Sequence, residues 1–212
     1  MTYLFVDREN AGKKLGHALE YLKDDKPVIL ALPRGGVIIA DEVAKILNVP
    51  IDVVISRKIG APGHPEFGIG AISEDGKPSF NKDVMSYYKP EERLLNGLIK
   101  KETHELKRRV KLYRGGHKLS GLENKTIIVV DDGLATGVTA ISAANYLKTF
   151  HPKKLILAVP VGPSAINPEL NEAYDEIICL QLLRNLRSVG EWYLSFNQVE
   201  DEEVLNILKK YH

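Results

Sequence analysis

Four consecutive β-branched apolar residues, Ile127–Val130, end at two adjacent carboxylates, Asp131 and Asp132. A run this short and this apolar predicts a strand buried on both faces, as the strands of a parallel sheet are. A turn of mostly small residues follows, and Val138–Phe150 then has the pattern of a helix. Because a buried strand that turns directly into a helix is the unit of α/β folds, this segment restricts the chain to few architectures.

The same alternation of apolar runs and helix-like segments recurs through most of the chain. The predicted strands are Val28–Leu32, Ile51–Ser56, Thr126–Val130, Leu155–Val159 and Glu176–Leu180. The predicted helices between them are Val37–Leu47, Val138–Phe150 and Ser164–Tyr174. We therefore predict an α/β fold with a mostly parallel sheet that is flanked by helices on both faces.

Three segments lie outside that predicted core. Arg8–Leu22 has one apolar face and predicts an additional N-terminal helix, and Pro90–Tyr113 predicts a long, charged middle helix. The tail, Gln181–His212, contains a short predicted helix near Asp201–Tyr211. The 212 residues, 44% of them hydrophobic, suit a single domain with its core at about 27–180 and candidate cap segments at 1–26 and 181–212.

Composition argues against several classes of function. The net charge of +1 gives no overall field that would attract nucleic acid or an anionic membrane, so neither partner is expected. No apolar run reaches the length of a membrane-spanning helix, and residues 1–9 lack the apolar core of a secretory leader, so we expect a cytoplasmic protein. The single cysteine, Cys179, excludes an internal disulfide framework and is expected to be buried.

The segment after Val130 has the chemistry of a site for a phosphorylated sugar. In a parallel sheet, ligands bind at the carboxyl ends of the strands, which is where Asp131 and Asp132 are expected. Ionised carboxylates only accept hydrogen bonds and therefore suit the vicinal hydroxyls of a ribose. The glycines after them, the hydroxyls of Thr136 and Thr139 and the predicted helix N-terminus together suit a phosphate group.

The segment from Val129 to Thr139 resembles the phosphoribosyl diphosphate (PRPP) signature of the type I phosphoribosyltransferases. The resemblance implies that Asp131 and Asp132 hold the 2- and 3-hydroxyls of the ribose and take part in catalysis. It implies that the loop after them binds the 5-phosphate. The residues of that loop are Gly133, Leu134, Ala135, Thr136, Gly137, Val138 and Thr139.

The loop after the first predicted strand resembles the pyrophosphate loop of the same family. Arg34 offers a forked cation there and is a third candidate catalytic residue, and Gly35 and Gly36 offer exposed backbone amides. The second predicted strand is followed by Arg57 and Lys58, two further candidates for binding the pyrophosphate. The glycine-rich segment 59–76 then predicts a long loop, which in the family is a flexible lid, with His64 and Glu66 as further candidates. The alternative for this segment is a structural hairpin with solvated charges.

The resemblance implies transfer of the 5-phosphoribosyl group of PRPP to a nitrogen acceptor, with Mg²⁺ bound through PRPP and water near Asp131 and Asp132. It also implies a homodimer. The acceptor stays open, because Ala135 stands where members that act on oxopurines carry an acid, and Asp132 stands where uracil-using members carry a proline. An alternative is a catalytically silent protein that senses PRPP or a nucleotide. A sugar-phosphate phosphatase or kinase would need a nucleophile or base that the sequence does not show.

Two sets of residues outside these motifs have two interpretations each. The basic side chains of the middle helix favour a solvated helix face, with a local anion- or RNA-binding face as the alternative. These residues are Lys100, Lys101, Lys107, Arg108, Arg109, Lys111 and Arg114. The aromatic residues Trp192, Tyr193 and Phe196 favour a place in the core, with stacking on a flat ring as the alternative.

Overall fold

Five parallel strands form the central sheet, in the order β2-β1-β6-β7-β8. The strands are β1 (Val28–Ala31), β2 (Ile51–Val53), β6 (Thr126–Val130), β7 (Lys154–Pro163) and β8 (Glu176–Leu183). The structure is a computed structural model that describes residues 3–211, except the side chains of residues 65, 66 and 83. The α/β fold with a mostly parallel sheet is confirmed.

The central strands are apolar throughout because both of their faces are covered. In β6, Ile128 and Val130 belong to one buried cluster, whereas Ile127 and Val129 belong to a second cluster on the opposite face. All four side chains are fully buried. The continuous apolar run thus reflects two cores on the two faces of one sheet.

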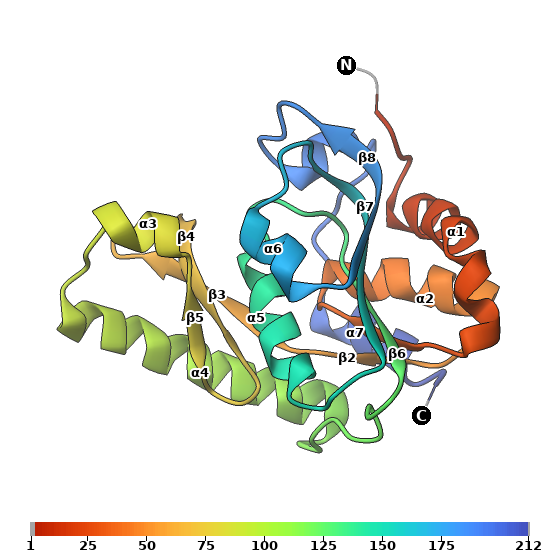
Figure 1. Ribbon diagram of the computed structural model, residues 1–212, viewed down its shortest axis with the longest axis horizontal. Coiled ribbons are helices and arrows are strands. Elements are labelled where there is room, and N and C mark those ends of the chain that lie inside the picture. The colour runs from red at the N-terminus through yellow and green to blue at the C-terminus, as the bar shows by residue number, and fades with distance from the viewer. Residues whose placement is uncertain (1–2, 212) are drawn as a thin grey trace.

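Helices cover the two faces of this sheet (Figure 1). The first cluster is completed by residues of α1 (Arg8–Ala18), α2 (Gly35–Leu47) and α7 (Asp201–Leu208). The second is completed by residues of α5 (Val138–Lys148) and α6 (Pro168–Ala173). Two short 3₁₀ helices, η1 (Glu20–Asp25) and η2 (Val189–Trp192), follow α1 and β8.

A second, antiparallel sheet lies beside the core. The prediction of a long loop at 59–76 was wrong, because most of this segment belongs to that sheet. The sheet contains β3 (Ser56–Ala61), β4 (His64–Ser73) and β5 (Pro78–Phe80), so β2 ends at Val53 and the second sheet begins at Ser56. The hairpin alternative is therefore the correct one. The glycines that suggested a loop allow close packing instead, since a Cβ on Gly70 would lie 2.5 Å from the carbonyl oxygen of Ser79.

Two helices pack with this sheet, and the second of them runs along it back to the core, as Figure 1 shows. They are α3 (Lys82–Tyr87) and α4 (Glu92–Arg114), and α4 packs against β3 and β4. The predicted middle helix is confirmed, with its end at the left-handed Gly115. A carboxyl–guanidinium pair between Glu74, which directly follows β4, and Arg114 at the end of α4 joins the two elements, and each side chain is 4% exposed.

Several predicted boundaries were wrong. The helix predicted at Ser164–Tyr174 is limited to Pro168–Ala173, because Asn167 caps its start by accepting a hydrogen bond from the amide of Glu169, and Pro168 follows in the first turn. The N-terminal helix ends at Ala18 and is followed by a 3₁₀ turn. Cys179 is half-buried rather than buried, since β8 is the edge strand of the sheet. Within residues 3–211, no helix is long and apolar enough to span a membrane.

Candidate functional site

The two predicted ribose-binding carboxylates lie at the carboxyl end of β6. Asp131 Oδ1 accepts a hydrogen bond from the backbone amide of Asp132 at 2.8 Å. The carbonyl oxygen of Asp132 accepts one from the hydroxyl of Tyr193 at 2.6 Å, and Tyr193 is 2% exposed. Contacts from the strand end and from the tail thus fix the backbone that carries both carboxylates.

The loop after the carboxylates turns into α5, as predicted. Gly137 has a φ of 75° and caps the helix, a conformation that glycine adopts readily. Leu134 and Val138 are buried, so only their backbone groups can face a ligand. The side chain of Thr136 is exposed and that of Thr139 is half-buried. Because the first amides of a helix have no partner within it, this turn can bind a phosphate.

The predicted pyrophosphate loop packs directly against the two carboxylates. A Cβ added to Gly35 would lie 1.9 Å from Asp132 Oδ2, and one added to Gly36 would lie 2.7 Å from the carbonyl oxygen of Val130 and 3.3 Å from Asp131 Oδ1. Both glycines belong to the first turn of α2. The structure therefore brings together two loops that lie about a hundred residues apart in the sequence.

Burial controls the electrostatics of the two carboxyl groups. It raises the pKa of Asp131 well above its usual range, and the neighbouring charge of Asp132 raises that pKa further. It also raises the pKa of Asp132, while Arg8 acts in the opposite direction. Two desolvated carboxylates side by side are costly unless a cation or a donor-rich ligand compensates them.

Arg8, a residue without a predicted role in the site, provides that cation. Its Nε donates to Asp132 Oδ2 at 2.8 Å, and its Nη1 donates to the carbonyl oxygen of Asn197 at 2.8 Å. The guanidinium carbon lies 3.7 Å from the centre of the Phe196 ring. Only the predicted N-terminal helix pointed to this region, and no local signal in the sequence connects Arg8 with Asp132.

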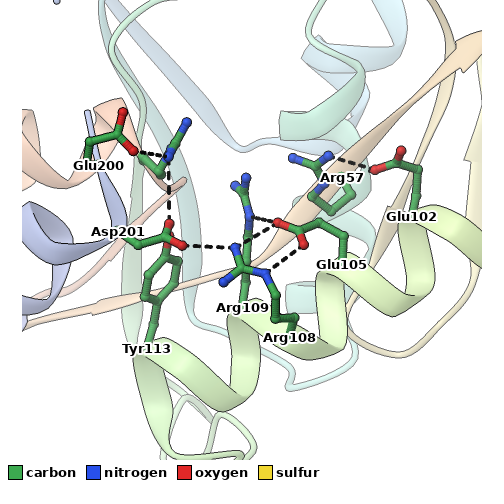
Figure 2. Close-up of polar contacts among 9 residues, drawn as sticks. Arg57, Glu102, Glu105, Arg108, Arg109, Tyr113, Glu200 and Asp201 are labelled. Atoms are coloured by element: carbon green, nitrogen blue, oxygen red, sulfur yellow. Dashed lines mark hydrogen bonds and ion pairs between the residues drawn. The ribbon is translucent and has the colours of Figure 1, made fainter. Parts of the chain in front are cut away.

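Arg34 reaches acids at the start of α7 rather than remaining unpaired. Its Nη1 lies 3.2 Å from Glu200 Oε2 and 3.8 Å from Asp201 Oδ1. Asp201 also accepts hydrogen bonds from the hydroxyl of Tyr113 and from Arg108 Nη2 on α4 (Figure 2). The predicted pyrophosphate loop is thereby connected with both α4 and α7.

Other basic side chains that were candidates for ligand binding are also paired with acids. Arg57 donates through Nε and Nη2 to Glu102 Oε2 at 3.0 and 2.8 Å. Figure 2 shows Glu105 between Arg108 and Arg109, which donate to its two oxygens, and their hydrogen bonds lower the pKa of Glu105 to about 2. The prediction of a uniformly solvated basic face on this helix was wrong for Arg109 and Arg114, whose side chains are 12% and 4% exposed.

The remaining candidates have different environments. Lys58 is half-buried, with its aliphatic stem along Gly68 of the hairpin, and His64 is exposed. The side chain of Glu66 lies outside the described residues. Tyr193 is buried and Phe196 packs on it at 4.9 Å between ring centres, which favours the core interpretation of the aromatic tail. Among the described residues, no cluster of three or more His, Cys, Asp or Glu side chains could hold a metal ion.

Comparison with known proteins identifies the family. A model of the phosphoribosyl transferase domain matches residues 6–195. The chain belongs to this family. The match includes the carboxylates of β6, the glycine loop of α2, the second sheet and most of the aromatic tail.

Relatives of this phosphoribosyl transferase domain occur in bacteria. Two strains of Mycobacterium tuberculosis contain a protein, provisionally named a phosphoribosyl transferase, that is 39% identical over 209 residues. The match covers 99% of this chain and 47% of the relative, so the chain spans about half the length of the curated relatives it matches.

Solved structures share the fold. The crystal structure of the protein TT1426 from Thermus thermophilus is 36% identical, has a TM-score of 0.77, and the match covers 100% of this chain and 99% of that one. A hypothetical protein from Neisseria gonorrhoeae, whose structure contains bound ppGpp, has a TM-score of 0.51 at 13% identity, with 99% and 96% of the two chains covered. At that identity the likeness shows a shared fold alone.

Proposed function

We propose that this protein transfers the 5-phosphoribosyl group of PRPP to a nitrogen acceptor and releases pyrophosphate. The observation that carries the proposal is the contact between the two loops. Gly35 lies so close to Asp132 that no side chain fits between them. A ligand with a diol, a 5-phosphate and a diphosphate would therefore meet the carboxylates, the turn into α5 and the loop of α2 at one edge of the sheet.

In the proposed reaction, the lone pair of the acceptor nitrogen attacks C1 of the ribose, and the C1–O bond breaks with its electrons remaining on pyrophosphate. Asp131 and Asp132 would bind the ribose hydroxyls and stabilise positive charge that develops on the ring. Arg34 and the amides of Gly35 and Gly36 would stabilise the leaving group, and Arg57 and Lys58 of β3 would assist.

The two carboxylates also suit Mg²⁺, a hard cation that prefers oxygen ligands and retains water. Neighbouring Asp131 and Asp132 are the residues that would hold it near the ribose, through PRPP and water. When bound, the ion would neutralise charge on the diphosphate. Self-association and a cytoplasmic location stay predictions, and light scattering of the purified chain would test the first of them.

The proposal is tested by measuring pyrophosphate release from PRPP and Mg²⁺ across a panel of nucleobases, orotate, nicotinate and small amines. Asp132→Asn is expected to weaken PRPP binding about 10- to 100-fold, because one charged acceptor is lost. Asp24→Asn, on an exposed turn, is the matched control and should behave as the wild type. Release with one acceptor, lost in Asp132→Asn, would establish the transferase. PRPP binding without release would favour the sensor, and unchanged binding by Asp132→Asn would refute the site.

A further inference from the structure

Arg8 is a buried cation that contacts the proposed ribose site and the tail. Its side chain is 10% exposed. One edge of the guanidinium donates to Asp132, another nitrogen donates to the backbone of Asn197, and the face of the group lies on Phe196. A planar guanidinium that is fixed at two edges and one face has little freedom to turn. Its position therefore determines the position of the carboxylate that it holds.

The ion pair occupies one of the two oxygens of Asp132. Oδ2 receives Arg8 and faces the backbone of Gly35. In the part of the chain that the structure describes, no side chain donates to the other oxygen, Oδ1; besides Arg8, the group that reaches this carboxylate is the backbone amide of Asp132 itself. A carboxylate accepts hydrogen bonds at both oxygens, so Oδ1 keeps its capacity for a ligand hydroxyl. Arg8 thus determines which carboxylate oxygen of Asp132 can accept a hydrogen bond from a ligand.

The same contact compensates the charge of the site. Asp131 and Asp132 are neighbours in a desolvated place, and without a cation one of them would be favoured to take up a proton and to lose an acceptor. Arg8 lies against Asp132 from α1, Asp131 lies beside it on the same loop, and Tyr193 contacts its carbonyl oxygen from the tail. Arg8 is the cation among these facing groups.

We propose that Arg8 is a positioning residue, which holds Asp132 so that Oδ1 meets a hydroxyl of the ribose diol. This inference rests on the proposed function and adds to it a residue from the N-terminal helix. A merely structural role would join α1 to the tail through Asn197 and Phe196 without affecting the recognition of hydroxyls. The two roles differ in what they predict for ligands with and without a diol.

The test is calorimetric binding of ribose 5-phosphate and of inorganic phosphate to four proteins: wild type, Arg8→Met, Arg8→Lys and Lys13→Met. Lys13 lies in the same helix, is largely exposed and pairs with Glu42, so its variant removes the same charge away from Asp132. Arg8→Met should weaken ribose 5-phosphate about 10- to 100-fold and change phosphate binding less than about twofold. Arg8→Lys should recover part of the loss, because it keeps the charge without the forked geometry.

The measured affinities distinguish a positioning role of Arg8 from a merely structural one. Equal affinity for ribose 5-phosphate in the wild type and Arg8→Met, or equal losses for both ligands, would overturn the positioning role. If Arg8→Met fails to fold, Arg8→Lys carries the test, with an expected loss of roughly threefold or more for ribose 5-phosphate alone. If the wild type binds neither ribose 5-phosphate nor PRPP, the proposed function itself fails, a result that differs from a failure confined to the Arg8 variants.

Discussion

Replacing Gly35 with alanine tests whether the α2 loop and the carboxylates form one site. The added Cβ would lie 1.9 Å from Asp132 Oδ2, 2.7 Å from Asp132 Cγ and 2.9 Å from Arg8 Nε. Real Cβ atoms essentially never approach another heavy atom within 3.0 Å, so the carboxylate must retreat by about 1.1 Å, the difference between 3.0 and 1.9 Å. This displacement of the carboxylate is opposed by the 2.8 Å hydrogen bond that Arg8 Nε donates to the same oxygen.

The sign of the effect follows from two opposing magnitudes. Alanine has the higher helix propensity, which favours the variant by up to about 1 kcal/mol at an interior helix position and by less at the first residue of α2. Overpacking of a well-filled site costs about 1–3 kcal/mol. We therefore expect Gly35→Ala to lower the free energy of unfolding by about 1–2 kcal/mol, and to weaken PRPP binding at least about tenfold.

Urea denaturation and calorimetry with PRPP measure the two effects on the same samples. Gly97→Ala is the matched control, because this glycine lies inside α4 and a Cβ there would meet nothing within 4 Å. It should raise the free energy of unfolding by about 0.5–1 kcal/mol and leave PRPP binding unchanged. Wild-type stability and affinity in Gly35→Ala would refute the close packing of the two loops.

Two further predictions concern an ion pair and a thiol. Arg114→Met should lower the free energy of unfolding by about 3–5 kcal/mol in urea denaturation, with much of it recovered in the double variant with Glu74→Met. Burial raises the pKa of Glu74 above its unfolded value, so protonation at low pH favours the folded state. The stability lost in Arg114→Met should therefore shrink towards pH 5. A stability loss that depends on neither pH nor the Glu74→Met substitution would contradict a buried ion pair between Glu74 and Arg114. Burial raises the pKa of the Cys179 thiol to about 11, so at pH 8.5 iodoacetamide should alkylate the folded chain about 100-fold more slowly than the urea-unfolded chain, by mass spectrometry. Equal rates would show an accessible thiol of ordinary pKa.

The parallel core was predictable because its signals are local. Strands buried on both faces must be apolar throughout, and Thr126–Val130 was predicted with the bounds that the structure has. The turn that follows the strand depends on glycine at Gly137, where φ is positive. Both features are properties of a few consecutive residues, which a single sequence displays directly.

The rest depends on contacts that no short segment contains. The glycines of 59–76 have the composition of a loop, and only their packing against neighbouring strands makes them part of a sheet. The acids that hold Arg34 and Arg57 lie on α7 and α4, and their chemistry in isolation is that of ordinary helix surfaces. Arg8 and Asp132 have no pattern that relates them, because tertiary structure alone places them together.

The contacts around Asp132 determine when during synthesis the site can be complete. Arg8 is separated from Asp132 by 124 residues and from Asn197 by 189, and Tyr193 is 61 residues beyond the carboxylate. A ribosome therefore delivers the cation first, the carboxylates much later and the enclosing tail last. Closure over such long separations is entropically expensive and slow. A nascent chain that ends before Tyr193 lacks the hydroxyl that contacts Asp132 and the two residues that fix Arg8, Phe196 and Asn197. The parallel sheet can therefore form before the site is complete.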